Sequence, residues 1–310
     1  MNKPIKIGTR GSKLALWQAN WIKSALTGKY PSRSVELVPI KTKGDKILDV
    51  PLAMVGGKGL FVKEIEDALL NGHIDLAVHS MKDMPADIPN GLCIGAIPKR
   101  ENPQDVLISK KKLKLSELKP KAKIGTSSLR RKAQLLFARP DLVVLPLRGN
   151  LDTRLKKLET EDLDAIVLAA AGVKRLGLED RITEYLDEKI MLPAVGQGAL
   201  CVEIRQNEPE IEALVLPLEH QQTRTIVTAE RAFLNRLEGG CQIPIAAQGK
   251  ITEDTLTLTG LVADIDGTTV IKDTLSGEKH SAKKIGMTLA NRLLSRGAKE
   301  IMTQTERIKL

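Results

Sequence analysis

The stretch IKIGTRGSKLALWQA at residues 5–19 and the stretch AKIGTSSLRRKAQLL at residues 122–136 follow the same plan. Each starts with a short apolar run, passes through a Gly-Thr pair into a basic polar loop, and ends in an amphipathic helical pattern. A strand that leads directly into a helix is the repeating unit of parallel α/β sheets. The two copies therefore predict two α/β domains of similar build.

A second pair of similar stretches follows the first pair in the same order. GHIDLAVHS at residues 72–80 and EDLDAIVLAAA at residues 161–171 are apolar, β-rich runs that the chain enters through Asp after a helical segment. Each predicted domain thus contains two strands that follow one another in the same order along the chain. We expect each domain to contain a mostly parallel sheet with helices on both faces.

The pattern changes from about residue 220 onward. TRTIVTAERAFLNRLEGG at residues 223–240 predicts a helix that glycines end. The alternating stretches QIPIAAQGKI, TLTLTGLVAD and TTVIKDTLS then predict an antiparallel meander with a turn at Asp266-Gly267, followed by a last helix over roughly 279–298. We therefore expect a third, smaller α+β domain.

The length of 310 residues suits several domains, because single hydrophobic cores stop growing at about 250–300 residues. MLPAVGQGAL at residues 191–200, with one Pro and two Gly, is typical of a hinge or crossing segment. We expect a first domain over 1–98 and 199–217, a second over 99–198 and a third over 218–310.

The charge balance predicts an anionic partner. Lys and Arg outnumber Asp and Glu by 48 to 38, so the net charge is +10, which suits a nucleic acid, a membrane surface or a polyacidic small molecule. Only three Phe, two Trp and two Tyr are present, which disfavours the aromatic stacking platforms that bind single-stranded nucleic acid. The chain has no apolar run of about 18 residues and starts without the apolar core of a signal peptide, so we expect a cytoplasmic protein.

Polar and basic residues follow the predicted strands. In parallel α/β sheets, ligands bind beyond the carboxyl ends of the strands. The residues at these places are Thr9-Arg10-Gly11-Ser12, Ser80-Met81-Lys82-Asp83, Thr126-Ser127-Ser128-Leu129-Arg130-Arg131 and Arg148-Gly149-Asn150. Each group contains hydroxyls, arginines or a lysine, and this predicts a basic binding site.

Arginines indicate the chemistry of the ligand. Arg130 and Arg131 occupy the first turn of a helix that a Ser/Thr cluster caps, and Arg148, Arg154 and Arg175 follow downstream. A surface salt bridge explains any one of them. The set at strand ends favours a polycarboxylate or a polyphosphate, because guanidinium groups bind both in a bidentate manner.

The sequence gives little support for a phosphate-binding loop or a metal site. GGKGLF at residues 56–61 lacks the P-loop spacing, and no G-x-G-x-x-G opens a helix. The histidines His73, His79, His220 and His280 have no ligand spacing, so each is expected to be an ordinary core or surface residue. These patterns weaken the nucleotide and metal interpretations.

Two further residues could carry chemistry. Asp83 follows Lys82 after a predicted strand, where a carboxylate could stabilise a cation or transfer a proton, or form a simple loop ion pair. Cys241 follows two glycines and is displayed, either as a reactive thiol or as a small apolar residue. Cys93 and Cys201 lie far from it in sequence, so no disulfide framework or C-x-x-C pair is indicated.

Eight motifs follow one another along the chain: TRGSKLALWQ, GGKGLFVKEIE, AVHSMKDMP, IGTSSLRRKAQL, RGNLDTRLKKL, DAIVLAAAGVKRLG, LPAVGQGAL and EGGCQIPIAA. Together they closely resemble the porphobilinogen deaminase family, also called the hydroxymethylbilane synthases. The resemblance extends from about residue 5 to about residue 247, and the rest of the chain fits in length and pattern.

The resemblance implies a fold and an activity. The implied fold has two α/β domains around a cleft, as in periplasmic binding proteins, and a smaller C-terminal α+β domain with an antiparallel sheet. The implied enzyme is a monomeric transferase of haem and tetrapyrrole biosynthesis. It joins four porphobilinogen units head to tail with release of ammonia, and releases hydroxymethylbilane by hydrolysis. The family builds this product on a dipyrromethane cofactor, bound by a thioether to the cysteine that corresponds to Cys241.

The resemblance also implies roles for individual residues. Asp83 is the implied catalytic carboxylate, which would stabilise the cation left when porphobilinogen loses ammonia. The implied cofactor-binding residues are Cys241, Ser80, Lys82, Asp83, Thr126, Ser127, Ser128, Arg130, Arg131 and Arg148. The implied substrate-binding residues are Arg10, Ser12, Lys58, Phe61, Arg148, Arg154 and Arg175, and no metal is implied.

Two other classes of function stay open from the residues alone. Paired α/β domains with an anion site also describe non-catalytic solute-binding modules, which need neither Asp83 nor a displayed cysteine. The net charge suits nucleic-acid binding, but the chain contains no recognition motif for it.

Overall fold

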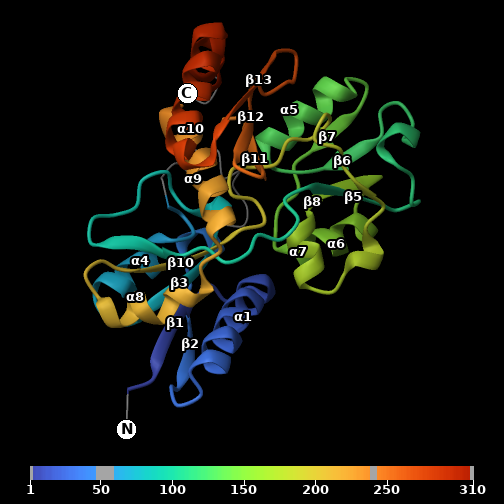
Figure 1. Cartoon of the computed structure of the whole chain (residues 1–310). Coiled ribbons are helices and arrows are strands. Elements are labelled where there is room, and N and C mark those ends of the chain that lie inside the picture. Colours follow the sequence, from blue (N-terminus) through green and yellow to red (C-terminus); the bar gives the residue numbers. More distant parts are fainter. Residues whose placement is uncertain (1–2, 47–58, 238–242, 308–310) are drawn as a thin grey trace. The chain divides into compact units, whose positions relative to one another are not determined.

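A computed structural model describes residues 3–46, 59–237 and 243–307 of the chain (Figure 1). These residues divide into two compact units. Unit 1 holds the described residues within 1–49, 57–101 and 198–224, and unit 2 holds those within 102–197 and 225–310.

Unit 1 is built around a five-stranded sheet with the order β2-β1-β3-β10-β4. Its strands are β1 (Ile5–Thr9), β2 (Val35–Pro39), β3 (Leu76–Ser80), β4 (Leu92–Ala96) and β10 (Leu200–Arg205). Its helices are α1 (Lys13–Lys29), α2 (Lys43–Lys46), α4 (Lys63–Leu70) and α8 (Pro209–Val215), with 3-10 turns η1 (Met81–Asp83) and η4 (Leu216–Leu218). Strand β1 is parallel to β2 and β3, whereas β10 is antiparallel to β3 and β4.

Helices cover both faces of this sheet because successive strand residues point to opposite sides. Leu76 and Val78 of β3 pack into one apolar cluster with residues of α1 and α8. Ala77, between them, packs into a second cluster with Ile65 and Leu69 of α4. The prediction of a mostly parallel sheet covered on both faces is confirmed for unit 1.

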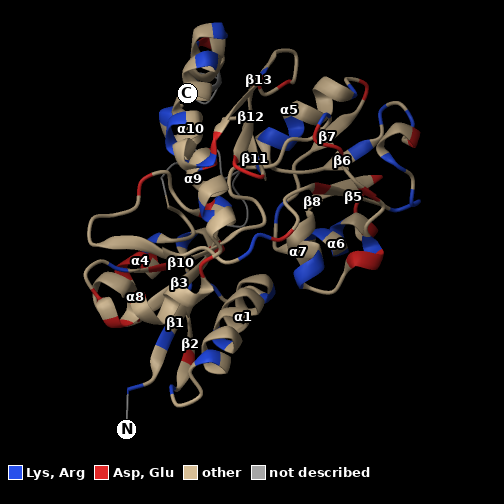
Figure 2. Cartoon of the chain, viewed as in Figure 1, with Lys and Arg blue, Asp and Glu red and all other residues tan. Residues whose placement is uncertain are grey.

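Unit 2 contains a second five-stranded sheet, with the order β7-β6-β8-β5-β9. Its strands are β5 (Asp105–Ser109), β6 (Lys123–Gly125), β7 (Val143–Leu145), β8 (Ala165–Ala169) and β9 (Glu184–Tyr185). Its helices are α5 (Leu129–Ala138), α6 (Leu151–Thr160) and α7 (Ala170–Arg175), with 3-10 turns η2 (Leu115–Glu117) and η3 (Glu179–Arg181). Figure 2 shows Lys and Arg on α5, α6 and α7.

The two sheets share one topology. Strand β1 in unit 1 and strand β6 in unit 2 are each flanked by two parallel neighbours. An antiparallel strand then separates β3 from the edge strand β4, and likewise β8 from the edge strand β9. Strand β5 of unit 2 takes the place that β10 takes in unit 1. The duplication predicted from the repeated sequence plan is therefore confirmed.

The chain passes between the units at Glu101 and again at Gln197. Each crossing leads directly into the antiparallel strand of the sheet that the chain enters, β5 after the first and β10 after the second. Gly196 and Gly198 have φ values of 70° and 87°, a left-handed backbone that favours glycine. The crossing predicted for residues 191–200 is confirmed.

A third sheet lies in unit 2 and is antiparallel, in the order β11 (Ile245–Thr252), β12 (Thr255–Ala263) and β13 (Val270–Glu278). Helix α9 (Gln221–Arg236) begins in unit 1 and continues into unit 2. The remaining elements are η5 (Lys279–Ser281), α10 (Ala282–Leu293), a π-helical turn η6 (Leu294–Ala298) and α11 (Lys299–Arg307). The predicted meander is confirmed.

The predicted last helix differs in one respect, because the chain bends at Gly297, with a φ of 99°, and continues as α11. A shared apolar cluster joins Ala133 of α5 to Ala246 of β11 and Leu261 of β12. This cluster explains why the second and third sheets fall into one compact unit. The three-domain boundaries given above stay a prediction.

Candidate active site

The carboxyl ends of β1 and β3 lie at the same edge of the unit 1 sheet, because the two strands are parallel neighbours. Arg10 and Ser12 follow β1, and Ser80 ends β3. Ser12 caps α1, its Oγ accepting a hydrogen bond of 3.3 Å from the Ala15 amide. Gln18 of α1 donates to Ser80 Oγ at 3.0 Å, so α1 is tied to the end of β3.

Arg10 is engaged by a carboxylate of the chain itself. Its Nε lies 3.1 Å from Asp45 Oδ1, and its Nη2 makes a closer contact with the same oxygen. Burial raises the pKa of Asp45, but the hydrogen bond and charge of Arg10 outweigh it and hold that pKa below its usual value. The Arg10 guanidinium also lies over the Phe61 ring, 4.3 Å from its centre. The structure thus brings Arg10 and Phe61 together.

Lys82 and Asp83 lie in η1, directly after β3, and both are half-buried. The flanking side chains of Met81 and Met84 are buried, with exposed fractions of 2% and 5%, and hold the turn on the core. The Met81 amide also donates to the Ala199 carbonyl at 3.0 Å. The anchored turn keeps the Asp83 carboxylate at the sheet edge that carries Ser80.

A buried polar cluster that the sequence pattern does not indicate lies next to this turn. His79 Nε2 lies 3.1 Å from Glu203 Oε2, and both side chains are buried. Burial, followed by the negative charge of Glu203, raises the pKa of Glu66 to about 7. His79 was expected to be an ordinary core or surface residue, and it is a buried one. The sequence signal for this cluster is the presence of acidic residues, Glu66 and Glu203, within otherwise apolar helix and strand patterns.

In unit 2, Thr126, Ser127 and Ser128 connect β6 to α5. Thr126 Oγ1 accepts from the Ser128 amide at 3.2 Å, and Ser127 Oγ donates to the Leu147 carbonyl at 2.9 Å. Ser128 occupies the N-cap position of α5, but its side chain forms no capping hydrogen bond within the described part of the chain. The Ser128 hydroxyl is therefore not used for capping the helix.

Arg130 and Arg131 are buried, with exposed fractions of 6% and 5%. Both bind Asp105, a fully buried residue that is not among the site residues predicted from the sequence. Burial raises the pKa of Asp105, but attraction by Arg130 and Arg131 outweighs this effect and holds the pKa far below its usual value. The sequence signal for this buried carboxylate is a single Asp at the start of the otherwise apolar strand DVLIS.

Arg148, Arg154 and Arg175 are half-buried residues of unit 2. Arg154 Nε donates to the Gly149 carbonyl at 2.9 Å, and Arg175 ends α7. Arg148 Nη1 is buried and has no hydrogen-bond partner among the described residues. A buried donor without a partner is costly, which makes Arg148 a candidate for binding a ligand oxygen.

Several predicted features lie elsewhere or outside the described residues. Cys241 and Lys58 lie in stretches that the structure does not describe. Of the other cysteines, Cys201 is buried and Cys93 is half-buried, and burial raises the pKa of the Cys93 thiol. The described residues contain no group of three metal-ligating side chains, and none of their helices is long and apolar enough to cross a membrane.

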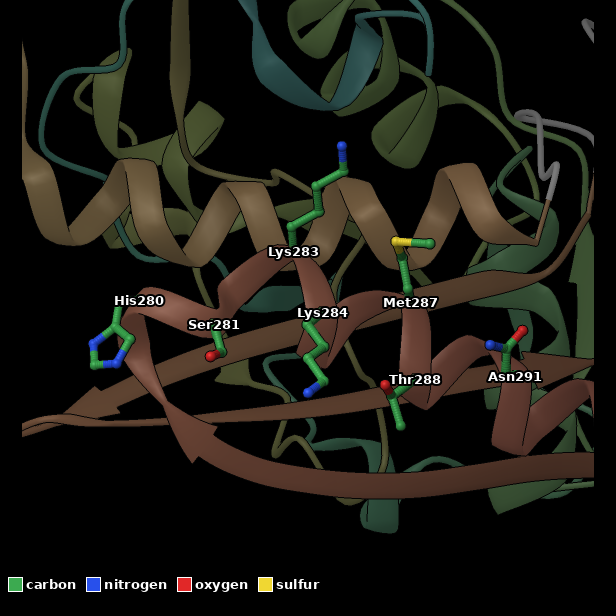
Figure 3. A pocket seen from close by; sticks show the side chains of 7 residues that line it. All are labelled: His280, Ser281, Lys283, Lys284, Met287, Thr288 and Asn291. Carbon is green, nitrogen blue, oxygen red and sulfur yellow. The ribbon is translucent and has the colours of Figure 1, made fainter.

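A pocket of unit 2 contains none of the predicted site residues (Figure 3). It is lined by His280, Ser281, Lys283, Lys284, Met287, Thr288 and Asn291. All seven come from η5 and α10, and none belongs to a strand end of the two five-stranded sheets.

Two five-stranded sheets of one topology, each with basic and hydroxyl-bearing residues beyond its parallel strands, define a protein with a duplicated α/β architecture. The chain belongs to the porphobilinogen deaminase family. Residues 5–213 match the family model described as "Porphobilinogen deaminase, dipyromethane cofactor binding domain", and residues 224–295 match the model of the C-terminal domain of porphobilinogen deaminase.

Close relatives cover nearly the whole chain. The chain is 55% identical to a porphobilinogen deaminase of Geobacter metallireducens over 302 residues, which cover 97% of this chain and 95% of that protein. It is 54% identical to a porphobilinogen deaminase of Carboxydothermus hydrogenoformans over 307 residues, which cover 99% of both chains. Among solved structures, the methionine binding protein MetQ aligns with a TM-score of 0.45 and 15% identity over 71% of this chain and 91% of that one.

Proposed function

We propose that this chain is the transferase that joins four porphobilinogen molecules head to tail, with release of ammonia, and releases hydroxymethylbilane in tetrapyrrole biosynthesis. The activity follows from membership of the porphobilinogen deaminase family across both of its domain models. The structural observation that carries the proposal is Arg148 Nη1, a buried donor with no partner among the described residues. Each pyrrole of the substrate bears two carboxylates, which are the acceptors that such a donor requires.

The residues of unit 2 fit a dipyrromethane cofactor. When bound, this group supplies the pyrrole carbon to which the first substrate is joined. Arg148 offers an unused guanidinium nitrogen, and Ser128 offers a hydroxyl that does not cap its helix. Thr126, Ser127, Arg130 and Arg131 lie in the same loop and helix start, so we place the cofactor carboxylates against this segment. Arg154 and Arg175 then bind carboxylates of the substrate or of the growing chain.

Asp83 is the proposed catalytic residue. Its half-buried carboxylate lies beside Lys82 in a turn that two buried methionines anchor. Positive charge develops on a pyrrole as ammonia leaves and again as the new carbon–carbon bond forms. A fixed carboxylate stabilises that charge without reorganising, and it can deliver or accept a proton at the same place.

Unit 1 supplies further contacts for substrate. Arg10, Ser12 and Phe61 are the proposed substrate residues, together with Lys58. The Arg10 guanidinium is bound to Asp45, so a substrate carboxylate has to take the place of Asp45 or share the guanidinium with it. Ser80 and Lys82 complete this group at the end of β3 and contact the cofactor.

Cys241 is the proposed attachment point. Its Sγ would hold the cofactor through a thioether and would thereby tether it to the chain. We further propose a cytoplasmic monomer whose partner is the small-molecule substrate and not a nucleic acid or a membrane.

An intact-mass measurement tests the cofactor. Purified protein should exceed the mass of its sequence by two linked pyrrole units, and a Cys241→Ser variant should have the mass of the bare chain. A wild-type mass equal to the bare chain, in protein that turns over without an added primer, would contradict the proposal.

Asp83→Asn tests the catalytic carboxylate. The variant should keep the primer mass while turnover falls by about 100-fold or more, since a charge-stabilising group is lost. Asp87→Asn is the matched control, because Asp87 is an exposed carboxylate in the same loop. Turnover of the Asp83 variant within a few-fold of wild type would exclude the assigned role.

A further inference from the structure

Asp105 lies at the edge of the unit 2 sheet where the parallel strands have their carboxyl ends. It is the first residue of β5, and it pairs with Ala169, the last residue of the antiparallel neighbour β8. The start of β5 is therefore at the same edge as the ends of β6 and β8. The residue is fully buried, which is unusual for a carboxylate unless it is paired.

Two adjacent arginines bind this carboxylate. Arg130 Nη1 donates to Asp105 Oδ2 at 2.7 Å, and Arg131 Nε donates to Oδ1 at 2.9 Å. Arg131 Nη2 lies 2.7 Å from the same Oδ1, and Gln197 Nε2 donates to it at 3.1 Å. The four donors come from α5 and from the second crossing segment.

The remaining bonds of the two guanidinium groups differ. Arg131 Nη1 donates to the Val167 carbonyl at 2.9 Å, so all three of its nitrogens bond to the protein. Arg130 Nη1 also donates to the Leu192 carbonyl, at 2.6 Å. Within the described part of the chain, Arg130 is bonded through Nη1 alone, so its Nε and Nη2 are left for another acceptor.

The electrostatics of the cluster explain why a carboxylate is needed. Two neighbouring guanidinium groups repel each other, and burial of either without an anion is costly. One carboxylate between two guanidinium groups leaves the cluster with one net positive charge. The two oxygens of the carboxylate also fix the orientation of both guanidinium planes, because guanidinium nitrogens donate in fixed directions.

We propose that Asp105 is a positioning residue: it holds Arg130 and Arg131 in one orientation, with a single net positive charge, for binding the carboxylates of the dipyrromethane cofactor. This inference rests on the proposed function, in which Arg130 and Arg131 contact the cofactor. Asp105 acts through the arginines and touches neither cofactor nor substrate.

Asp105→Asn is the direct test, because Asn keeps the shape of the side chain and removes its charge. The fraction of purified, folded protein that carries the cofactor mass should fall at least about tenfold, as expected when a buried ion pair loses one partner. In the loaded remainder, the KM for porphobilinogen should rise more than kcat falls. Asp141→Asn is the matched control, since Asp141 pairs with Arg139 at the far end of α5 and is exposed.

A second variant separates positioning from stability. Asp105→Asn combined with Arg131→Gln keeps the cluster at one net positive charge and leaves no unpaired second cation, so it should fold where the single variant does not. Its cofactor-loaded fraction should be at least about tenfold below that of Arg131→Gln alone, because in the double variant Arg130 also loses the anchor that fixes its plane.

The outcomes are distinct. A folded single or double variant that carries the cofactor fully, with a wild-type KM, would overturn the role of Asp105 and leave the proposed function intact. A wild-type protein without cofactor mass would instead overturn the proposed function. Loss of cofactor in Asp105→Asn relative to Asp141→Asn and wild type, and in the double variant relative to Arg131→Gln alone, supports the inference.

Discussion

Half-buried arginines of this protein differ in whether the fold satisfies all of their nitrogens. Arg139 is fully used, donating to the carbonyls of Leu115 and Leu118 and to Asp141. Arg148, by contrast, keeps a buried nitrogen without a partner among the described residues. A satisfied arginine contributes to stability, whereas an unsatisfied one lowers it and is available to a ligand. We therefore expect substitution of the two arginines to have opposite effects on stability and on ligand binding.

Arg148→Met should leave the unfolding temperature of the cofactor-free Cys241→Ser protein unchanged or raise it, because an unmet buried donor is removed. In protein with Cys241 intact, it should lower cofactor loading or raise the KM for porphobilinogen at least about tenfold, because a charged hydrogen bond is lost. Calorimetry and steady-state kinetics measure the two effects.

Arg139→Met is the control, and it should lower the unfolding temperature by several degrees while leaving KM unchanged. If Arg148→Met were the more destabilised of the two variants, Arg148 would have partners in solution and its assignment to ligand binding would fail.

Glu66 should make stability depend on pH. Its pKa of about 7 in the folded protein is above the ordinary value of 4.5, so the folded state keeps a proton that the unfolded state has released. Stability from this group is therefore complete below about pH 4.5 and is lost as pH rises through about 7. The charged groups that act on Glu66 are Glu203 of β10, His79 of β3 and Asp67, which follows Glu66 in the sequence.

Glu66→Gln should flatten this part of the pH profile, because glutamine mimics the protonated acid at every pH. Unfolding temperatures measured between pH 5 and pH 8 provide the comparison with wild type. An equally steep decline in the variant would show that another group is responsible.

At the scale of elements, close approach of backbones fixes how the helices pack. Gly286 of α10 faces α9, and an added Cβ would lie 2.2 Å from the Ala229 carbonyl oxygen and 2.9 Å from Ala232 Cβ. Both neighbours are parts of a regular helix and cannot turn away as a long side chain could. The third sheet and its helices therefore depend on this glycine for their packing distance.

Gly286→Ala should lower the unfolding temperature by several degrees, although alanine favours a helix by about 1 kcal/mol over glycine. Gly28 in α1 offers the matched control, since an added Cβ there would meet nothing within 4 Å. Gly28→Ala should raise stability by about 0.5–1 kcal/mol. Thermal unfolding of both variants decides the matter, and a stabilised Gly286→Ala protein would refute the tight helix contact.

At the scale of the whole molecule, a net charge of +10 is spread over a chain whose two units repeat one sheet topology. Both units place arginines or lysines beyond parallel strands, and each substrate unit adds two negative charges. Attraction between the protein and the growing chain is thus a sum over many charges, part of which salt screens.

The KM for porphobilinogen should rise severalfold between about 0.05 M and about 0.5 M monovalent salt, because the screening length falls below the distances between exposed charges. Initial rates at several salt concentrations provide the measurement, with sucrose of equal osmolarity as the control. A KM that does not change with salt would mean that buried contacts alone bind the substrate.

Much of this architecture was predictable from the sequence. The repeated strand-loop-helix plan predicted both α/β sheets, because periodicity and turn residues act locally. The Asp266-Gly267 turn and three alternating stretches likewise predicted the antiparallel sheet. The same reasoning placed Arg10, Asp83 and Arg148 at strand ends, where the structure has them. Their roles in binding and catalysis stay predictions.

The pairing of buried charges was not predictable, because it depends on strand order and register. Asp105 meets Arg130 and Arg131 across 25 and 26 residues of sequence, since β5 is inserted beside β8 and opposite to it in direction. His79 meets Glu203 across 124 residues for the corresponding reason in unit 1. The sequence by itself determined which segments form strands and helices and which polar residues follow them. Tertiary structure alone decided which arginines are neutralised by the protein and which nitrogen of Arg148 has no partner among the described residues, because such contacts form between strands that only folding brings together.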